Sequence, residues 1–333
     1  MFKSAKGGVW RPFSESAQVS CRGRSLLLQR RLTDFGSEKS FARAAEQVKE
    51  HYGFEISPST VRRVTEAHGQ RLHGHPELLQ GDAAGEAKAQ LIVEADGTMI
   101  PVVTTDPAQQ IDQRKTRKTA WKEARLALVQ ENGSVHPIFG ASTGTPEQIG
   151  EQMANCASRV GWDTHTQIHG VGDGAPWIAD QVECVFGAQG QYLIDFYHLC
   201  DYLAAASKSC SANPDEWYKI QKNRFLTGRM KAVLKALASH IEPSSLEDPN
   251  APVRVCDRYI RNRLAQFDYP GALQAGLPIG SGRNEGAHRY VIQERLKLSG
   301  AWWKIDNADK MLALRVTRAN GNWEKYWNSR KAA

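Results

Sequence analysis

Residues 33–72 place their apolar side chains at the three- and four-residue spacing of an amphipathic helix, which predicts two short helices. The apolar stripe of the first helix consists of Phe41, Ala44, Ala45 and Val48. Gly53 ends this helix, and the second begins behind Ser57, which can cap it, with Pro58 at its first position. Two short helices joined by a tight turn are typical of a helix-turn-helix. A helical hairpin with a solvated charged face fits the same pattern.

In the helix-turn-helix interpretation the second helix faces DNA, and its candidate contacts are Thr60, Arg62 and Arg63. Polar segments flank the two helices. We interpret residues 1–32 as a basic arm that leads into a short helix at 24–32. Residues 73–90 contain several Gly and Pro residues and are interpreted as a linker.

From residue 91 onward the pattern changes to that of an α/β domain. Short apolar runs predict strands, and longer runs at helical spacing predict helices. The predicted strands are 91–96, 99–104, 122–130, 134–141, 166–171 and 191–196, with helices at 146–160 and 175–186. Asn132-Gly133 predicts a hairpin between the third and fourth of these strands.

Strand character is lost after residue 198. Residues 199–270 are predicted to form a helical insertion. The α/β core then has two parts, residues 91–198 and residues 271–333, and the second part carries predicted helices at 285–296 and 307–319.

The charge of the chain favours a polyanionic partner. The formal net charge is +7, and the excess lies at both ends: residues 1–80 hold 13 Lys and Arg against 8 Asp and Glu, and residues 286–333 hold 10 against 4. The six cysteines form no Cys-x-x-Cys pair, which argues against a structural zinc site and a disulfide scaffold. No segment has the apolar length of a membrane span or a signal peptide, so we expect a cytoplasmic protein with no membrane partner.

Three carboxylates stand out: two in or directly after apolar runs, where a charge is costly unless a cation meets it, and one at the start of a helix-like segment. They are Asp96, Asp173 and Glu285, and a glycine follows each of them. Carboxylates without a Cys/His cluster favour Mg²⁺ or Mn²⁺, and two such ions can activate a nucleophile and stabilise a leaving oxygen. Each Asp-Gly alone also fits an ordinary turn. His288 and Arg289 lie one turn beyond Glu285 and would touch the scissile phosphate or neutralise the carboxylates.

Two further groups suggest contacts with nucleic acid. One is a basic loop that holds Arg114, Lys115, Arg117 and Lys118. The other is the pair Trp302-Trp303, which lies among basic residues and could stack on frayed or flipped bases. Because adjacent side chains cannot both face one core, we expect one of the two tryptophans to point outward. For the basic residues the alternative is an ordinary solvated loop, and for the tryptophans the alternative is packing in the core.

The sequence motifs around the three carboxylates resemble those of the DDE transposases of ISKra-type insertion sequences. The matching stretches are Asp96-Gly97-Thr98, 172–178 (GDGAPWI), 276–282 (GLPIGSG) followed by Glu285, and 295–303 (RLKLSGAWW). Asp195 and His198 match the Asp-x-x-His element of the related Mutator-like enzymes. The resemblance runs from about Arg11 to Trp327. Relatives often carry a longer amino-terminal region, which leaves autonomous transposition open.

The resemblance implies an RNase H-like core of the retroviral-integrase type, with an all-helical insertion and a preceding helix-turn-helix. It implies that Asp96, Asp173 and Glu285 are catalytic and hold two Mg²⁺ (or Mn²⁺) ions, with Asp195 and His198 as supporting residues near the DNA. The implied partners are double-stranded DNA, as terminal inverted repeats and target, and a second subunit in a homodimer on that DNA. The implied location is the cytoplasm, in association with the nucleoid.

The leading hypothesis from the sequence is therefore a metal-dependent transposase that cuts element ends and joins them to target DNA. A decayed or repurposed transposase that acts as a sequence-specific DNA-binding protein is a second hypothesis, disfavoured by the complete triad. A nuclease with an RNase H-like fold and no strand transfer is a third, disfavoured by the helix-turn-helix pattern.

Overall fold

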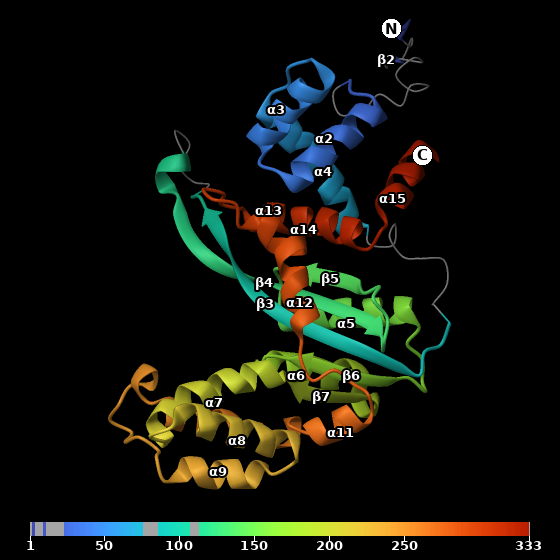
Figure 1. The fold of residues 1–333 in the computed structure, drawn as a ribbon. Coiled ribbons are helices and arrows are strands. Elements are labelled where there is room, and N and C mark those ends of the chain that lie inside the picture. The colour runs from blue at the N-terminus through green and yellow to red at the C-terminus, as the bar shows by residue number, and fades with distance from the viewer. Residues whose placement is uncertain (1, 4–8, 11–22, 76–85, 107–112, 333) are drawn as a thin grey trace.

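A computed structural model describes the chain except residues 1, 4–8, 11–22, 76–85, 107–112 and 333. Figure 1 shows a helical unit from the first part of the chain, a sheet below it, and a second group of helices under the sheet. The helices of residues 294–319 lie between the first unit and the sheet, and the last helix of the chain stands beside them. None of the helices in the described ranges is long and apolar enough to cross a membrane.

The N-terminal helical unit consists of α2 (Leu26–Glu38), α3 (Phe41–Tyr52) and α4 (Pro58–Gly74). The predicted boundaries of α3 and α4 are confirmed, because Gly53 takes the left-handed conformation with φ +70° and the Ser57 side chain accepts a hydrogen bond from the N–H of Thr60. The helix α2 is longer than the predicted 24–32. The three helices bury a core made of Leu32, Ala44, Ala45, Val48, Val61 and Val64.

The central sheet has the strand order β5-β4-β3-β6-β7. Its strands are β3 (Gln90–Thr104), β4 (Lys118–Glu131), β5 (Ile138–Ser142), β6 (Gln167–Gly172) and β7 (Gly190–Ile194). The strand β4 is antiparallel to both of its neighbours, β3 and β5, while β6 runs parallel to β3 and β7 parallel to β6. The predicted hairpin at Asn132-Gly133 is confirmed, although β5 begins at Ile138 and not at residue 134.

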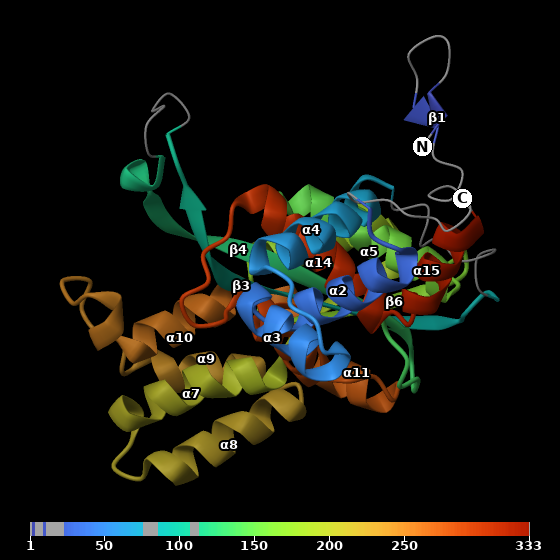
Figure 2. The same cartoon turned by 90° about the horizontal axis from the view of Figure 1, so that it is seen from above.

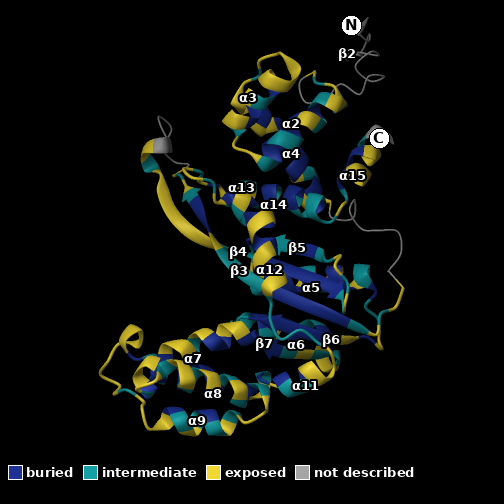
Figure 3. Cartoon of the chain, in the orientation of Figure 1, coloured by how far each residue is buried: buried dark blue, intermediate teal, exposed yellow. Residues whose placement is uncertain are grey.

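The predicted break between strands 91–96 and 99–104 is wrong. Both belong to β3, which pairs with β4 without interruption from Leu91, opposite Glu131, to Thr104, opposite Lys118. Gly97 stays in the ladder because its missing side chain leaves room for Glu123, whose Oε1 would lie 2.0 Å from a Cβ at this position. The distal parts of β3 and β4 extend beyond the other strands, and much of distal β4 is exposed (Figures 2 and 3).

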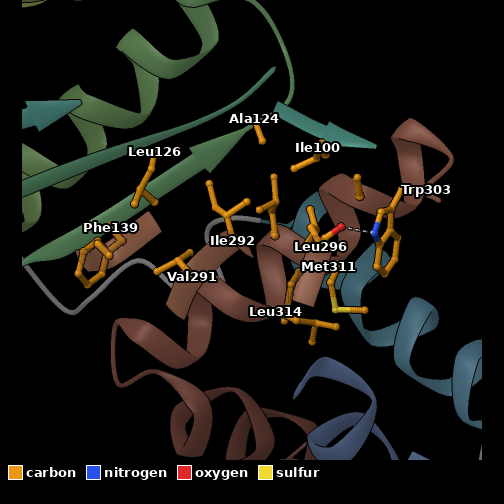
Figure 4. Packing of buried hydrophobic residues seen from close by; sticks show 14 of the residues in the cluster. Ile100, Ala124, Leu126, Phe139, Val291, Ile292, Leu296, Trp303, Met311 and Leu314 are labelled. Atoms are coloured by element: carbon orange, nitrogen blue, oxygen red, sulfur yellow. Dashed lines mark hydrogen bonds between the residues drawn. The ribbon is translucent and has the colours of Figure 1, made fainter. Parts of the chain in front are cut away.

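Two layers of helices cover the sheet. On one face α5 (Pro146–Val160), as predicted, and α6 (Pro176–Phe186) pack on the side chains of Val93 and Val129. On the other face the C-terminal helices pack on Ile100 and Leu126 (Figure 4). These are α12 (Gly282–Ala287), a π-helical turn (His288–Gln293), α13 (Glu294–Leu296), α14 (Ile305–Ala319) and α15 (Trp323–Ala332).

The segment predicted as a helical insertion contains five α-helices with their own core. They are α7 (Phe196–Cys210), α8 (Pro214–Leu226), α9 (Met230–Ala238), α10 (Pro252–Arg261) and α11 (Tyr269–Gln274). The helix α7 begins at Phe196 because Asp195 caps it, so the predicted strand 191–196 is too long at its end.

The N-terminal helical unit is fixed to the C-terminal helices by buried polar contacts. His68 of α4 lies with Nδ1 2.6 Å from the hydroxyl of Tyr326 in α15, and Nε2 lies 3.1 Å from Oε1 of Gln29 in α2. The guanidinium of Arg295 donates from Nε to the backbone carbonyl of Gly36 at 3.0 Å. Because these groups are buried, a substitution that removes one partner would leave the other unsatisfied, at about 1–3 kcal/mol for each.

Candidate active site

Asp96 and Asp173 occupy equivalent positions on two neighbouring parallel strands. The register of β3 and β6 pairs Glu94 with Val171, and each aspartate follows two residues later. Because neighbouring parallel strands keep their register, these positions place the two carboxylates near each other, one within β3 and the other directly after β6. Each charge is close enough to act on the other, since the charge of Asp173 contributes to raising the pKa of Asp96.

Asp96 lies in a partly desolvated position. Its side chain is 39% exposed, and its Oδ1 accepts a hydrogen bond of 2.6 Å from the N–H of Gly97. Burial raises the pKa of Asp96 to about 6, and the charges of Asp173 and Glu123 add to this, while the Gly97 hydrogen bond and the charge of His198 oppose it. A carboxylate with these neighbours favours a bound cation.

His288 is the histidine nearest to this carboxylate. Its Nε2 lies 3.7 Å from Oδ2 of Asp96, too far for a hydrogen bond. Burial lowers the pKa of His288 to about 4, so the imidazole is neutral at physiological pH. Neither ring nitrogen makes a hydrogen bond of normal geometry within the described ranges, although the backbone of Asp96 is close enough to raise the pKa of His288 against the effect of burial. His288 also begins the π-helical turn, a rare element that is frequent at functional sites.

The backbone at Asp173 is held by the helical insertion. Its Oδ1 accepts from the N–H of Ala175 at 2.8 Å, which forms a tight turn after β6. The hydroxyl of Tyr259 donates to the carbonyl of Asp173 at 2.7 Å, and Nε of Arg263 donates to the carbonyl of Gly174 at 2.8 Å. Gly174 has φ +87° and donates its N–H to the hydroxyl of Tyr192 at 3.1 Å. These contacts fix the position of the Asp173 carboxylate.

Asp195 and His198 have different environments. Asp195 is 8% exposed, and its Oδ1 accepts from the N–H groups of Tyr197 and His198 at the start of α7. Its Oδ2 accepts from both the N–H and the hydroxyl of Ser281 at 2.6 Å. Asp195 thus ties the loop before α12 to α7. His198 is exposed beside Tyr202, with 5.9 Å between the ring centroids, and its charge acts on Asp96.

A fourth carboxylate at this site was missed by the sequence analysis. Glu94 is 1% exposed, lies on the same face of β3 as Asp96, and accepts a hydrogen bond of 2.9 Å at Oε2 from the N–H of Asn284 in α12. Burial raises the pKa of Glu94 to about 7. Its two-residue spacing from Asp96 was the available signal, because side chains two apart share one face of a strand.

Glu285 and Arg289 are exposed on the helical segment that contacts Glu94 and Asp96 through Asn284 and His288. The structure therefore brings the segment that carries Glu285 to the carboxylate site. In the ranges that the structure describes, no three His, Cys, Asp or Glu side chains come together as a metal-binding group, so Asp96, Asp173 and Glu285 do not form one together here.

The predicted DNA contacts separate by exposure. Arg62 and Arg63 are exposed on α4, while Thr60 is 8% exposed and its side chain is hydrogen-bonded to Ser57. Trp302 is 37% exposed and Trp303 is 6% exposed, which confirms that one of the pair points outward. At the tip of β3 and β4, the exposed predicted residues are Lys115, Arg117 and Lys118. The side chain of Arg114 lies outside the described residues.

Curated relatives come from Caldanaerobacter subterraneus subsp. tengcongensis. UPF0236 protein TTE2489 is 23% identical over 293 residues, which cover 86% of this chain and 60% of that protein. A second UPF0236 protein, named after TTE0033 and ten further loci, is 26% identical over 168 residues, 50% of this chain and 34% of that protein. The chain thus spans between a third and three fifths of the length of these relatives.

Among solved structures, the Drosophila P element transposase strand transfer complex is weakly similar. The alignment covers 97% of this chain and 84% of that chain, with 9% sequence identity and a TM-score of 0.33. The model of the uncharacterised protein family UPF0236 matches residues 28–331, and the chain belongs to this family.

Proposed function

We propose that this chain is a metal-dependent DNA transposase with Asp96, Asp173 and Glu285 as its catalytic carboxylates. The observation that carries the proposal is the equivalent placement of Asp96 and Asp173 on two neighbouring parallel strands, with Asp96 within β3 and Asp173 directly after the end of β6. The motifs that surround these residues resemble those of ISKra-type transposases, and the strand order β5-β4-β3-β6-β7 is the order expected of the RNase H-like core that this resemblance implies.

The residues at the site fit a divalent cation. Asp96 and Asp173 repel each other, and no Lys or Arg in the described part of the chain forms an ion pair with either. Oxygen ligands from such carboxylates suit Mg²⁺ or Mn²⁺. Glu285 would complete the site after a shift of α12, a helix of six residues that continues into the π-helical turn. When bound, two such ions would polarise the scissile phosphodiester and stabilise its leaving oxygen.

The chain's own residues would orient the reacting groups. The contacts of Tyr259 and Arg263 with the turn at Asp173 keep its carboxylate in place before DNA arrives. In the proposed reaction, water attacks the phosphorus, the bond to the 3′ oxygen breaks, and this oxygen takes up a proton as the water loses one. The freed 3′ hydroxyl then loses its proton and attacks a target phosphodiester, whose bond to its own 3′ oxygen breaks, and this displaced oxygen takes up a proton.

DNA binding would use cations that are exposed around this site. Arg62 and Arg63 on α4 would contact the element end, and Lys115, Arg117 and Lys118 would reach phosphates from the tip of β3 and β4. A homodimer would hold two ends together. The eleven locus names that one relative carries in a single genome are typical of a mobile element and support the proposal.

The test is DNA cleavage by wild-type protein and Asp173→Asn. End-labelled fragments that flank the gene are incubated with Mg²⁺, with Mn²⁺ or with chelator. Metal-dependent nicks at a fixed position, absent with Asp173→Asn, are expected, and joined products distinguish a transposase from a nuclease. The variant should bind the same DNA as tightly as wild type or slightly more tightly, because a negative charge near the phosphate is removed. Specific binding without nicks under either metal would favour a repurposed DNA-binding protein.

A further inference from the structure

A pocket of about 580 Å³ lies between the N-terminal helical unit and the loop that joins α13 to α14. Its walls include Ser40 at the start of α3, Arg62 of α4, Val103 of β3, and residues 298–304. This volume is in the usual range for a small-molecule site. Val103 follows Asp96 by seven residues on β3, roughly 23 Å along the strand, so the pocket is separate from the carboxylate site.

The pocket has an excess of positive charge. Arg62, Arg295 and Lys304 line it, and the single carboxylate among its lining residues is that of Glu66. Glu66 Oε1 accepts a hydrogen bond of 3.0 Å from Nδ2 of Asn307, and burial raises the pKa of Glu66. Three cations against one hydrogen-bonded carboxylate favour an anionic ligand.

Arg295 makes this a built site. The side chain is 2% exposed, and its guanidinium lies 4.7 Å from the ring centroid of Phe41 and 4.8 Å from that of Trp303. Its Nε donates to the carbonyl of Gly36, whereas its Nη2 has no acceptor within the described residues. A buried guanidinium with an unused donor is costly, and an anion in the pocket would satisfy it.

Trp302 adds an exposed aromatic ring to the same pocket. Its neighbour Trp303 is anchored to β3, since the N–H of Val103 donates to its carbonyl at 2.8 Å and its own N–H donates to the carbonyl of Pro101 at 3.1 Å. The indole of Trp303 donates to the carbonyl of Leu296 at 3.0 Å (Figure 4). These contacts hold the backbone of Trp302 in place.

Two residues of distal β3–β4 also contact the Trp302 ring. The guanidinium carbon of Arg117 lies 5.6 Å from the ring centroid, and the ring of Trp121 lies 6.3 Å away at an angle of 56°. Trp121 is itself 59% exposed. Aromatic rings beside cations are typical of surfaces that bind single-stranded nucleic acid, because every base has a face that can stack.

We propose that this pocket holds one unpaired nucleotide of a DNA strand, with its base against Trp302 and its phosphate near Arg62, Lys304 and the free donor of Arg295. A paired base offers no face for such stacking, so the ligand is a nucleotide outside the duplex. The inference rests on the proposed function for DNA as the substrate. The roughly 23 Å from Asp96 to Val103 along β3 mean that the nucleotide is not the one being cut but lies several positions away.

The experiment compares two DNA probes without divalent metal. One is a duplex with a single unpaired 2-aminopurine, and the other carries the same 2-aminopurine in a base pair. Wild-type protein should quench the fluorescence of the unpaired base. It should also bind the first probe about tenfold more tightly than the second, because stacking of one base contributes about this much to affinity. Trp302→Ala should lose the quenching and the preference, while Trp302→Phe should keep part of both.

The variant Lys304→Gln tests the contribution of the Lys304 charge to phosphate binding and leaves the aromatic rings of the pocket in place. It should reduce the preference for the unpaired probe, whereas its matched control Lys231→Gln, an exposed lysine of α9, should behave as wild type. Equal binding of the two probes by wild type, or a preference that survives Trp302→Ala, would overturn the inference. Displacement of the unpaired probe by free deoxyadenosine monophosphate, at concentrations where a single-stranded oligonucleotide has no effect, would overturn the assignment to a DNA strand.

The outcomes of this experiment and of the cleavage assay are separable. Asp173→Asn should keep the full preference for the unpaired probe, because the pocket lies outside the carboxylate site. Metal-dependent nicking without any preference for the unpaired base would remove this inference alone. A preference without nicking would leave the pocket in place and remove the proposed catalysis.

Discussion

The hydroxyl of Tyr259 donates a hydrogen bond of 2.7 Å to the backbone carbonyl of Asp173, a residue 86 positions earlier in the chain. Tyr259 belongs to the helical insertion, where its ring stacks on Tyr202 with 4.0 Å between centroids and lies 4.5 Å from the guanidinium of Arg263. Arg263 in turn binds the carbonyl of Gly174. The helical insertion therefore positions one of the two aspartates that define the candidate site.

Replacing Tyr259 by Phe should reduce metal-dependent cleavage by about two- to tenfold, because a hydrogen bond of about 0.5–1.5 kcal/mol no longer holds the Asp173 turn. The ring stack with Tyr202 and the contact with Arg263 should survive. Tyr202→Phe is the matched control. It keeps the stacked ring, and among these two tyrosines it is the Tyr259 hydroxyl that donates to Asp173. Equal cleavage by Tyr259→Phe and wild type would show that the turn holds without this bond.

Gly174→Ala should affect the same turn more strongly. Gly174 has φ +87°, and a Cβ there would lie 2.6 Å from the Tyr259 hydroxyl. Gly53 also has positive φ, at +70°, but a Cβ there would meet nothing within 4 Å. Gly53→Ala should therefore cost only about 1 kcal/mol of strain, measured by urea unfolding, and Gly174→Ala more. Cleavage should fall only with Gly174→Ala. Equal losses of stability would indicate that the clash relaxes.

Local capping explains why parts of this fold were predictable. Gly53, Ser57 and Pro58 act on the backbone within one turn, so the end of α3 and the start of α4 follow from the sequence alone. Asp96 and Asp173 could also be singled out, because each lies where an apolar run meets a glycine. Their neighbouring positions required only that two strands be adjacent and parallel.

Features that depend on distant segments were not predictable. The continuity of β3 through Gly97 comes from β4, which pairs with it along its full length. Asp195 matched a catalytic motif, yet its hydrogen bonds to the start of α7 and to Ser281 give it a second role in holding the loop before α12. The contact of Glu94 with the backbone of Asn284 joins residues 190 positions apart, and no local pattern indicates it.

Glu285→Gln should abolish metal-dependent cleavage, with a loss of at least about a hundredfold, while leaving thermal stability unchanged because the side chain is exposed. DNA affinity should stay equal or rise slightly. Asp306→Asn, another exposed acid in the first turn of a helix, is the matched control and should cut normally. Cleavage by Glu285→Gln at the wild-type rate would exclude Glu285 from the triad.

Glu94→Gln should stabilise the protein at alkaline pH. Burial raises the pKa of Glu94 from 4.5 to about 7, so between these values the folded chain holds a proton that the unfolded chain has released. The free energy of unfolding therefore falls as the pH rises through this window, by about 3 kcal/mol in all. Gln keeps an acceptor for the Asn284 N–H and does not titrate. Urea unfolding with chelator, from pH 4.5 to 8, should show the advantage of the variant growing with pH. A constant difference would contradict the raised pKa.

The titration of His68 should change the free energy of unfolding with pH in the opposite direction to that of Glu94. Burial lowers the pKa of His68 from 6.5 to about 4, and the charges of Arg330 and Arg71 add to this. Its contacts suit the neutral ring, with Nε2–H donating to Gln29 and Nδ1 accepting from Tyr326. Between pH 6.5 and 4 the unfolded chain binds a proton that the folded chain excludes, so stability falls with falling pH, by about 3 kcal/mol in all.

The effects of His68 and Glu94 oppose each other over overlapping pH ranges, so the wild-type pH profile alone would hide both. His68→Gln removes the titration and keeps one donor and one acceptor for the same partners. Its packing cost is independent of pH and cancels from the slope. The stability of wild type relative to His68→Gln should therefore decrease as the pH falls from 6.5 to 4, measured by urea unfolding. A difference that stays flat would mean that His68 is protonated in the folded chain, and that its contact with Tyr326 does not depend on the neutral ring.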